Sequence, residues 1–289
     1  MKTSLYKQNT KEVYDKLYPD RHNFNPKLIE YEKKKIEKNI KEMGLKISDL
    51  KKMCIFNTGT GLESIIFHEL GAKKIYHYDI SNTGVKNLNH LRKTDPKFHN
   101  LYSEEMNLVE DKLSIPEGID LVYLQGVTHH FSDCKKGLDN IFSNLNKDAR
   151  IFIRNYRSGT LIFFVADFIR KFVNYDCMKD FNKVCHERFG DFPSHADWTS
   201  NLYTNIHTLS FDHFFVPSLH LHDTKELDNY FESNGFQNLL PQTLPEYNHA
   251  NFTDSAQTHT SFVYAKTTNR TDKFYGQFPK HVDQLSGII

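Results

Sequence analysis

The 289-residue chain has no surplus of charge of either sign, since 37 Lys and Arg are matched by 36 Asp and Glu. A basic field strong enough to hold RNA is therefore not expected over the whole surface. The four cysteines, at positions 54, 134, 177 and 185, form no C-x-x-C pair and no metal-binding spacing. Unpaired thiols are typical of a reducing compartment, so we expect a cytoplasmic protein.

Long apolar runs are also missing. The longest, residues 161–169, already contains Asp167, whereas a bilayer span requires about twenty apolar residues. The polar residues 1–9 lack the apolar segment of a signal peptide, and no internal repeat or Gly/Ser-rich linker divides the chain. The sequence therefore predicts no membrane span and no membrane partner.

Ring side chains are abundant by contrast, with 23 Phe, 15 Tyr, one Trp and 16 His. The aromatic residues concentrate in residues 156–216, which do not follow the pattern of the segments around them. We interpret this stretch as an inserted cap. It either has a small core of its own, forms a hydrophobic lid over a ligand site, or does both.

Short apolar runs alternate with amphipathic segments in most of the chain. Helical spacing over residues 10–50 predicts helices that end at Gly44. We then expect strands at 53–56, 74–78, 98–102, 121–124 and 149–154, helices at 62–70, 83–93 and 134–146, a helix at 224–234, and strands at 236–240 and 258–266. Such alternation predicts an α/β fold whose mostly parallel, doubly wound sheet is covered on both faces.

Two glycines, Gly59 and Gly61, separate the first expected strand from its helix. Glycine lets the backbone approach a ligand closely, and the helix N-terminus offers unpaired N–H groups. Asp79 ends the next strand, eighteen residues after Gly61, where a carboxylate could bind a ribose diol as it does in dinucleotide folds. The alternative is structural: a glycine turn, with Asp79 capping the following helix.

Three segments in this order resemble class I S-adenosylmethionine-dependent methyltransferases: 57–61 (NTGTG), 71–81 (GAKKIYHYDIS) and 120–131 (DLVYLQGVTHHF). The resemblance covers roughly residues 50–155. It implies a Rossmann-like, seven-stranded sheet and S-adenosylmethionine as the cofactor. It also implies that the glycine loop holds the methionine part of the cofactor, while Asp79 holds the ribose.

The resemblance further suggests that the adenine lies by residues that follow the third strand, and the methyl-donor side by residues 125–130. The cofactor contacts that we expect are Asn57, Thr58, Gly59, Gly61, Asp79, Ser103, Glu104, Met106 and Gln125.

The first motif departs from the family pattern. Ile55 and Asn57 stand where most members have an acidic residue and a glycine. Asn57 tolerates positive φ, so the turn is still feasible. The cationic amino group of the cofactor must then be met by water, by backbone carbonyls or by another side chain. The change leaves open weak cofactor affinity, a modified use of the cofactor, or a degenerate site.

Methyl transfer is an in-line displacement, and an oxygen or nitrogen acceptor must lose its proton, for which histidine is suited at neutral pH. His129 and His130 follow the fourth strand, where we favour a lining role over a catalytic one. His220 is our candidate for the general base. His220 and His222 could bind a metal together with Asp223, but no further ligand is fixed by spacing, so we expect no metal. Helix capping by Asp223 or Thr224 and substrate lining by the histidines are favoured instead.

On the acceptor side, Arg157 could pair with a carboxylate or phosphate, or lie on the surface. Tyr14 and Tyr18 resemble the N-terminal helix that folds over the cofactor in small-molecule methyltransferases, although packing would also explain them. The substrate-binding residues that we expect are Tyr14, Tyr18, Arg157, His213 and His222.

These observations divide the chain into an N-terminal helical cover (1–50), a cofactor-binding core (51–155), an inserted cap (156–216), and a C-terminal completion of the sheet with a tail (217–289). They predict an enzyme that methylates an oxygen or nitrogen of a small molecule, with no nucleic-acid partner. A non-catalytic binding or scaffold protein of the same fold is the first alternative, and an RNA methyltransferase is the last. The oligomeric state is left open.

Overall fold

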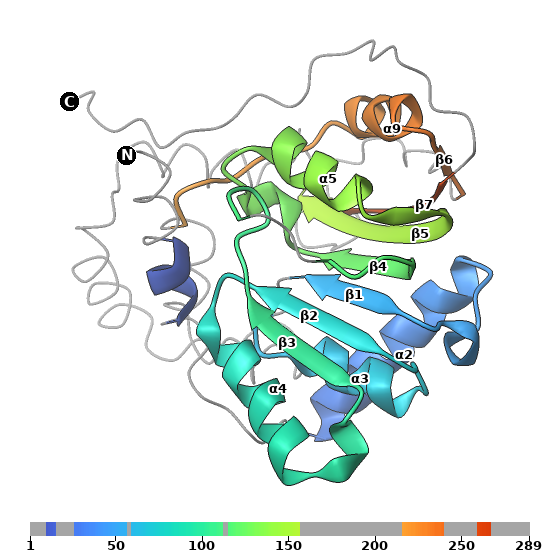
Figure 1. Ribbon diagram of the computed structural model, residues 1–289. Coiled ribbons are helices and arrows are strands. Elements are labelled where there is room, and N and C mark those ends of the chain that lie inside the picture. Colours follow the sequence, from blue (N-terminus) through green and yellow to red (C-terminus); the bar gives the residue numbers. More distant parts are fainter. Residues whose placement is uncertain are drawn as a thin grey trace.

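The computed structural model describes residues 10–15, 26–56, 59–111, 115–156, 216–239 and 259–266 (Figure 1). Residues 10–15 form a helical turn. The other elements are α2 (Pro26–Glu42), the 3-10 helix η1 (Ile47–Asp49), β1 (Met53–Phe56), α3 (Leu62–Glu69), β2 (Ile75–Asp79), α4 (Asn82–Thr94), η2 (Pro96–Phe98), β3 (Leu101–Glu105), β4 (Ile119–Gln125), η3 (Thr128–His130), α5 (Cys134–Phe142), β5 (Leu145–Tyr156), α9 (Thr224–Ser233), β6 (Phe236–Asn238) and β7 (His259–Lys266). Among these helices, none is long and apolar enough to cross a membrane.

The strands form one sheet in the order β3-β2-β1-β4-β5-β7-β6. Strands β1 to β5 are mutually parallel, whereas β7 runs antiparallel to both β5 and β6. Helices α3, α4 and α5 connect successive parallel strands, which confirms the expected Rossmann-like arrangement. The expected cap lies outside the described residues apart from its two ends, and the domain limits stay predictions.

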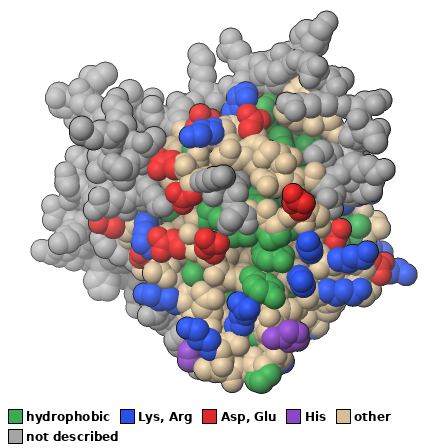
Figure 2. Space-filling view, in the orientation of Figure 1, with side chains coloured by type: hydrophobic (Ala, Val, Ile, Leu, Met, Phe, Trp, Pro, Cys, Tyr) green, Lys and Arg blue, Asp and Glu red, His purple; other side chains and the backbone are tan. Residues whose placement is uncertain are grey.

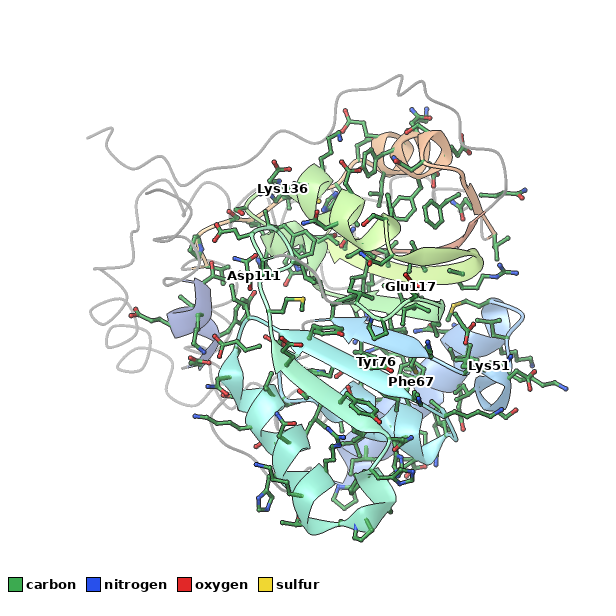
Figure 3. The ribbon with its side chains drawn as sticks, in the orientation of Figure 1. Lys51, Phe67, Tyr76, Asp111, Glu117 and Lys136 are labelled. Carbon is green, nitrogen blue, oxygen red and sulfur yellow. The ribbon has the colours of Figure 1, made fainter. Side chains whose placement is uncertain are left out.

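Two apolar layers cover the two faces of the sheet. Alternate residues of β4 point to opposite faces, so Leu121 packs with α2 and α3 while Val122 packs with α5 and α9. Figure 1 shows α2, α3 and α4 on one side of the sheet and α5 and α9 on the other. In the first layer the ring of Phe67, labelled in Figure 3, meets the Tyr123 ring edge-on at 5.1 Å. Burial of these layers supplies the main driving force for folding.

The third strand starts later than the sequence pattern predicts. It begins at Leu101, while Phe98 belongs to the short helix η2. Asp95 caps η2 by accepting a hydrogen bond from the Lys97 N–H, and Pro96 has no N–H to offer a strand ladder. Phe98 is buried against His68, with ring centroids 4.7 Å apart. An apolar residue in a buried turn was therefore mistaken for the start of a strand.

Helix α4 packs closely against the turn that follows β1. A Cβ atom at Gly84 would lie 2.5 Å from the carbonyl oxygen of Gly59 and 3.1 Å from the Gly61 nitrogen. Ser81 caps the helix by accepting a hydrogen bond from the Thr83 N–H. The absence of a side chain at Gly84 thus fixes how near the start of α4 comes to the glycine turn.

Overpacking against backbone atoms costs roughly 1–3 kcal/mol, whereas alanine is the better helix former by roughly 1 kcal/mol. We therefore expect Gly84→Ala to destabilise the protein by a net amount of about 1 kcal/mol. Urea unfolding measures the change, with the exposed Lys86→Ala on the same helix as a control that should stay within about 0.5 kcal/mol of wild type. A Gly84→Ala variant more stable than wild type would contradict this close approach.

Candidate functional site

The carboxyl ends of the parallel strands meet at one edge of the sheet. The chain moves outward from β1 to β3 and then returns to the opposite side of β1 with β4. Open α/β sheets bind ligands where the strand order reverses, which here is the edge between β1 and β4. The helical turn of residues 10–15 lies beyond the same edge (Figure 1). We therefore build the candidate site at this edge.

The turn after β1 depends on two glycines with positive φ. Gly59 has φ 59° and Gly61 has φ 83°, a region that favours glycine. Gly61 is the N-cap of α3, and its carbonyl accepts the Ile65 N–H at 3.2 Å. The amino end of α3 therefore begins at this edge of the sheet. The other two residues expected to bind the cofactor here, Asn57 and Thr58, lie outside the described residues.

Asp79, the last residue of β2, connects two turns through its carboxylate. Oδ2 accepts the Gly59 N–H at 2.9 Å, and Oδ1 accepts the Ser81 N–H at 2.7 Å. Burial raises the pKa of this carboxyl to about 6, although both N–H groups act in the opposite direction. The alternative structural role of Asp79, capping of α4, is taken by Ser81. Each Asp79 oxygen keeps a further lone pair that a ligand hydroxyl could use.

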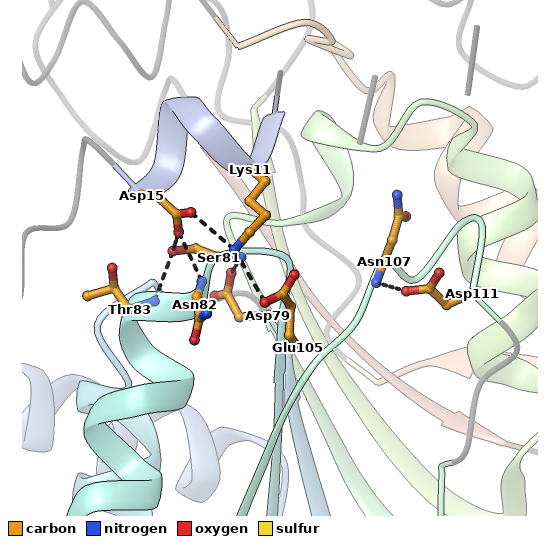
Figure 4. A network of polar contacts seen from close by, with 9 residues as sticks. All are labelled: Lys11, Asp15, Asp79, Ser81, Asn82, Thr83, Glu105, Asn107 and Asp111. Carbon is orange, nitrogen blue, oxygen red and sulfur yellow. Dashed lines mark hydrogen bonds and ion pairs between the residues drawn. The ribbon is translucent and has the colours of Figure 1, made fainter. Parts of the chain in front are cut away.

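The turn of residues 10–15 is attached to the start of α4 and the end of β3 by charged groups (Figure 4). Asp15 Oδ1 accepts hydrogen bonds from the Ser81 hydroxyl at 2.8 Å and the Asn82 N–H at 3.0 Å. Lys11 Nζ lies 3.1 Å from Asp15 Oδ2 and 3.3 Å from Glu105 Oε2. Burial alone would raise the pKa of Asp15, but these hydrogen bonds hold it below its usual value.

Tyr14, on the same turn, is buried and meets the His130 ring edge-on at 5.8 Å. Of the two tyrosines expected to cover the site, Tyr14 therefore reaches the end of β4, whereas Tyr18 lies outside the described residues. Lys11 and Asp15 are not among the residues predicted from the sequence. Their spacing of four residues on a helical turn is the one local signal of an ion pair.

The residues expected beside an adenine ring are placed differently from the prediction. Ser103 and Glu104 lie within β3, not after it. Met106 does follow the strand, is buried, and donates its N–H to the Asp79 carbonyl at 2.8 Å. The next residue, Asn107, was not predicted. Its side-chain Nδ2 is buried and has no hydrogen-bond partner among the described residues. Asn107 therefore offers a donor at this end of the edge.

Four histidines from two distant segments come together beyond β4 and β5. His129 and His130 belong to η3, and His220 and His222 precede α9; all four are buried. The backbone N–H of His220 donates to the His129 carbonyl at 2.7 Å, and the backbone N–H of His222 donates to the Tyr156 carbonyl at 3.0 Å. The four histidines thus form one cluster in the structure. In the sequence, only general features of the fold and the resemblance to methyltransferases indicated that they lie at the same edge.

Ring contacts fix the orientation of this cluster. His220 Nε2 lies 2.7 Å from the carbonyl oxygen of Phe131. Because a carbonyl only accepts, this nitrogen carries the hydrogen in neutral His220, and Nδ1 is the basic nitrogen. The His129 ring stacks on Tyr156 with centroids 3.7 Å apart. His220 is therefore held in a tautomer that suits a base.

His222 has a different environment. Its Nε2 lies 3.9 Å from the Cys134 sulfur, and burial, with a smaller effect of the His220 charge, lowers its pKa to about 3. His222 is therefore neutral at physiological pH. Within the part of the chain that the structure describes, no group of three or more His, Cys, Asp or Glu is arranged to hold a metal ion. Arg157 and His213 lie outside the described residues.

Gln125, the last residue of β4, is held in a chain of polar contacts. Its Oε1 accepts the Tyr123 hydroxyl at 2.9 Å, and that hydroxyl accepts from Asn39 Nδ2 at 3.0 Å. Its Nε2 donates to Glu63 Oε1 at 3.4 Å. Gln125 was expected at the site, but Glu63 was not. A carboxylate two residues after the second glycine was the available signal.

A family model described as a methyltransferase domain matches residues 28–240, which is well over half of the chain. No curated protein matches the chain in sequence.

Solved structures resemble the chain in fold. Magnesium protoporphyrin IX methyltransferase from Synechocystis PCC 6803, crystallised with bound SAH, is 14% identical with a TM-score of 0.52. The alignment covers 92% of this chain and 100% of that one. PKMT2 from Rickettsia typhi is 12% identical with a TM-score of 0.51 over 93% of this chain, which spans 55% of that protein. At such low identities these likenesses establish the fold alone.

We expect Asp79→Asn to change how stability depends on pH. The pKa of Asp79 is about 6 in the folded protein, above its ordinary value of 3.8. Between these two pH values the carboxyl is mostly protonated in the native state and mostly ionised in the unfolded chain. Ionisation of Asp79 therefore lowers stability as pH rises from about 4 to above 6. Asparagine cannot ionise, so the variant does not undergo this loss of stability. Its free energy of unfolding should therefore rise by roughly 2–3 kcal/mol relative to that of wild type when the pH is raised from 4 to 7.5.

Urea unfolding of both proteins at the two pH values measures this gain. The exposed Asp49→Asn serves as the control and should show no comparable change. An equal stability difference between Asp79→Asn and wild type at pH 4 and pH 7.5 would show that Asp79 does not titrate as described.

Proposed function

The chain belongs to the methyltransferase domain family, and from that premise we propose that it transfers a methyl group from S-adenosylmethionine to an oxygen or nitrogen of a small molecule. The observation that carries this proposal is the buried carboxylate of Asp79 at the end of β2, bonded to the glycine turn after β1. This pairing supports the proposal because a carboxylate that could bind hydroxyls and a turn that allows close approach both lie at the carboxyl edge of the sheet, where open α/β folds bind ligands.

The residues at this edge fit the adenosyl half of S-adenosylmethionine. Asp79 has lone pairs for the two ribose hydroxyls. Asn107 has a buried amide donor without a hydrogen-bond partner among the described residues, which suits a ring nitrogen of adenine. The glycine turn allows backbone to approach the cofactor. When bound, the cofactor supplies an electrophilic methyl group on a cationic sulfur.

The histidine cluster fits the acceptor side. If an acceptor hydroxyl or amine took the methyl group as the methyl–sulfur bond broke, leaving S-adenosylhomocysteine, the acceptor would lose a proton, and His220 Nδ1 would take that proton. The Phe131 carbonyl supports this role, because it accepts from Nε2 and would also stabilise the protonated ring. The His129 ring stacked on Tyr156 would give a flat wall, and His130 with Tyr14 would border the side towards residues 10–15. These buried groups would exclude water from the reacting atoms.

A small acceptor is favoured by the charge distribution. The chain as a whole carries a formal charge of +1, and Figure 2 shows Lys and Arg side chains alongside Asp and Glu side chains on the face that it draws. Recognition of RNA relies on phosphate contacts by clustered basic residues. The interspersed charges support a small molecule over a polyanion.

A non-catalytic binding protein of the same fold is the second candidate. The observation that favours it is Ile55, an apolar residue, fully buried at the position where most of the family has an acid. Such a protein would bind the cofactor weakly or not at all. The binding experiment that follows separates the two candidates.

We expect S-adenosylmethionine to bind the wild-type protein and Asp79→Asn to weaken binding by roughly 100-fold, because hydrogen bonds to a charged group contribute about 1.5–3 kcal/mol each. Affinity for wild type should also fall below about pH 6, where Asp79 becomes protonated, since the neutral carboxyl is a poorer acceptor. Isothermal titration calorimetry measures both effects. Asp49 is exposed and lies 30 residues before Asp79 in the sequence, so Asp49→Asn should bind the cofactor as wild type does. An absence of binding heat with the wild-type protein would contradict the proposed function.

A further inference from the structure

The ammonium group of S-adenosylmethionine has no acidic partner on β1. Ile55, at the corresponding position, is fully buried and belongs to the apolar layer shared with Leu62 and Tyr123. A charged group would be costly in that layer unless paired. The strand therefore contributes packing at this position, and any carboxylate that pairs with the ammonium comes from another element.

Glu63 provides a carboxylate at the right edge. It stands in the first turn of α3, two residues after the N-cap Gly61, where the helix dipole favours a negative charge. Its Oε1 lies 3.4 Å from Nε2 of Gln125, the last residue of β4. Strands β1 and β4 are neighbours, with Phe56 opposite Leu124. The Glu63 carboxylate therefore reaches the strand reversal between β1 and β4, beside the glycine turn.

Gln125 is oriented to keep that carboxylate in place. The Tyr123 hydroxyl donates to Gln125 Oε1, so the amide group of Gln125 is directed at Glu63. Tyr123 is fully buried, and burial raises the pKa of its hydroxyl, which therefore stays a donor at all working pH values. Asn39 of α2 donates in turn to the Tyr123 oxygen. Three elements thus determine the position of one acidic side chain.

The surroundings of Glu63 carry charges of both signs. Lys35 Nζ and Glu32 Oε2, both on α2, are 2.6 Å apart, with side chains 19% and 4% exposed. Burial lowers the pKa of Lys35, Glu32 and Glu63 raise it, and the charge of Arg154 lowers it. Two acids and two cations are therefore close enough to influence one another. Such a mixed environment suits a zwitterion, which brings an ammonium and a carboxylate but no net charge.

We propose that Glu63 holds the ammonium group of S-adenosylmethionine, taking the role of the acid that Ile55 replaces, and that Gln125 positions its carboxylate. The proposal rests on the proposed function, because it assigns the amino-acid end of the same cofactor. It commits to α3 in place of β1 as the element that carries the counter-charge. Glu63 is a binding residue and Gln125 a positioning residue.

Two ligands separate the amino-acid end of the cofactor from its adenosyl end. S-adenosylhomocysteine has the ammonium and carboxylate of S-adenosylmethionine, whereas 5′-methylthioadenosine lacks both. We expect Glu63→Gln to weaken S-adenosylhomocysteine binding about 10-fold to 100-fold, the usual effect of losing a charged hydrogen bond. Binding of 5′-methylthioadenosine should stay within about twofold. Calorimetric titration of both ligands into the full-length variants measures this difference.

A matched control and a second variant complete the experiment. Glu69→Gln removes the same charge from the exposed last residue of α3 and should change neither affinity. Gln125→Met should weaken S-adenosylhomocysteine alone by a smaller factor, about 2-fold to 10-fold, as expected for a neutral hydrogen bond. Melting temperatures of all variants show whether each is folded.

The outcomes distinguish this inference from the function on which it rests. Unchanged S-adenosylhomocysteine affinity in Glu63→Gln, with normal binding by wild type, would overturn the inference and leave the proposed function intact. Equal losses for both ligands would also overturn it, because Glu63 would then act through the shape of the whole site. If wild type binds neither ligand, the proposed function fails, and the inference fails with it.

Discussion

The edge of this sheet depends on one buried carboxylate. Asp79 ends β2 and uses one oxygen for the glycine turn after β1 and the other for the start of α4. A buried carboxylate is costly unless it is hydrogen-bonded, so the two backbone N–H groups are required wherever Asp79 is ionised. The close approach of Gly84 to Gly59 brings α4 against the same turn. The charge and the missing side chain together set the spacing between β1, β2 and α4, and hence the shape of the site.

The sequence was sufficient for most of the fold because its signals are local. β1 has the predicted limits, and the other parallel strands begin or end within a few residues of their predicted limits. Leu121 and Val122 of β4 lie on opposite faces of the sheet, and both are buried. Short apolar runs of this kind allow buried strands to be predicted from the sequence. The error at Phe98 has the same origin, since burial in a turn and burial in a strand leave the same apolar residue in the sequence.

The site was harder to predict because its contacts join distant residues. Asp15 accepts a hydrogen bond from Ser81, and Lys11 pairs with Glu105. The backbone N–H of His220 donates to the His129 carbonyl. No spacing in the sequence predicts these pairs. The glycines and Asp79 could be proposed from the sequence because a turn and a strand end impose a spacing of their own. Asn107 lies one position beyond Met106, and the exact end of β3 decides which of the two follows the strand at the edge. Motifs therefore indicate which edge of the sheet to consider, while the fold determines which side chains lie there.

The altered first motif shows how charge and packing can be assigned to different elements. An acid at the end of β1 would serve the edge of the sheet and border its interior at once, and in this chain Ile55 serves the interior alone. The first turn of α3 is a better position for the negative charge on physical grounds. The helix dipole stabilises it there, and Gln125 can bond it without burying it in an apolar layer. With the carboxylate on α3 at Glu63, β1 can contribute only apolar packing at Ile55. A carboxylate still lies near the strand reversal between β1 and β4. If the helix that follows the glycines carries the charge, as proposed for Glu63, the apolar Ile55 is compatible with cofactor binding.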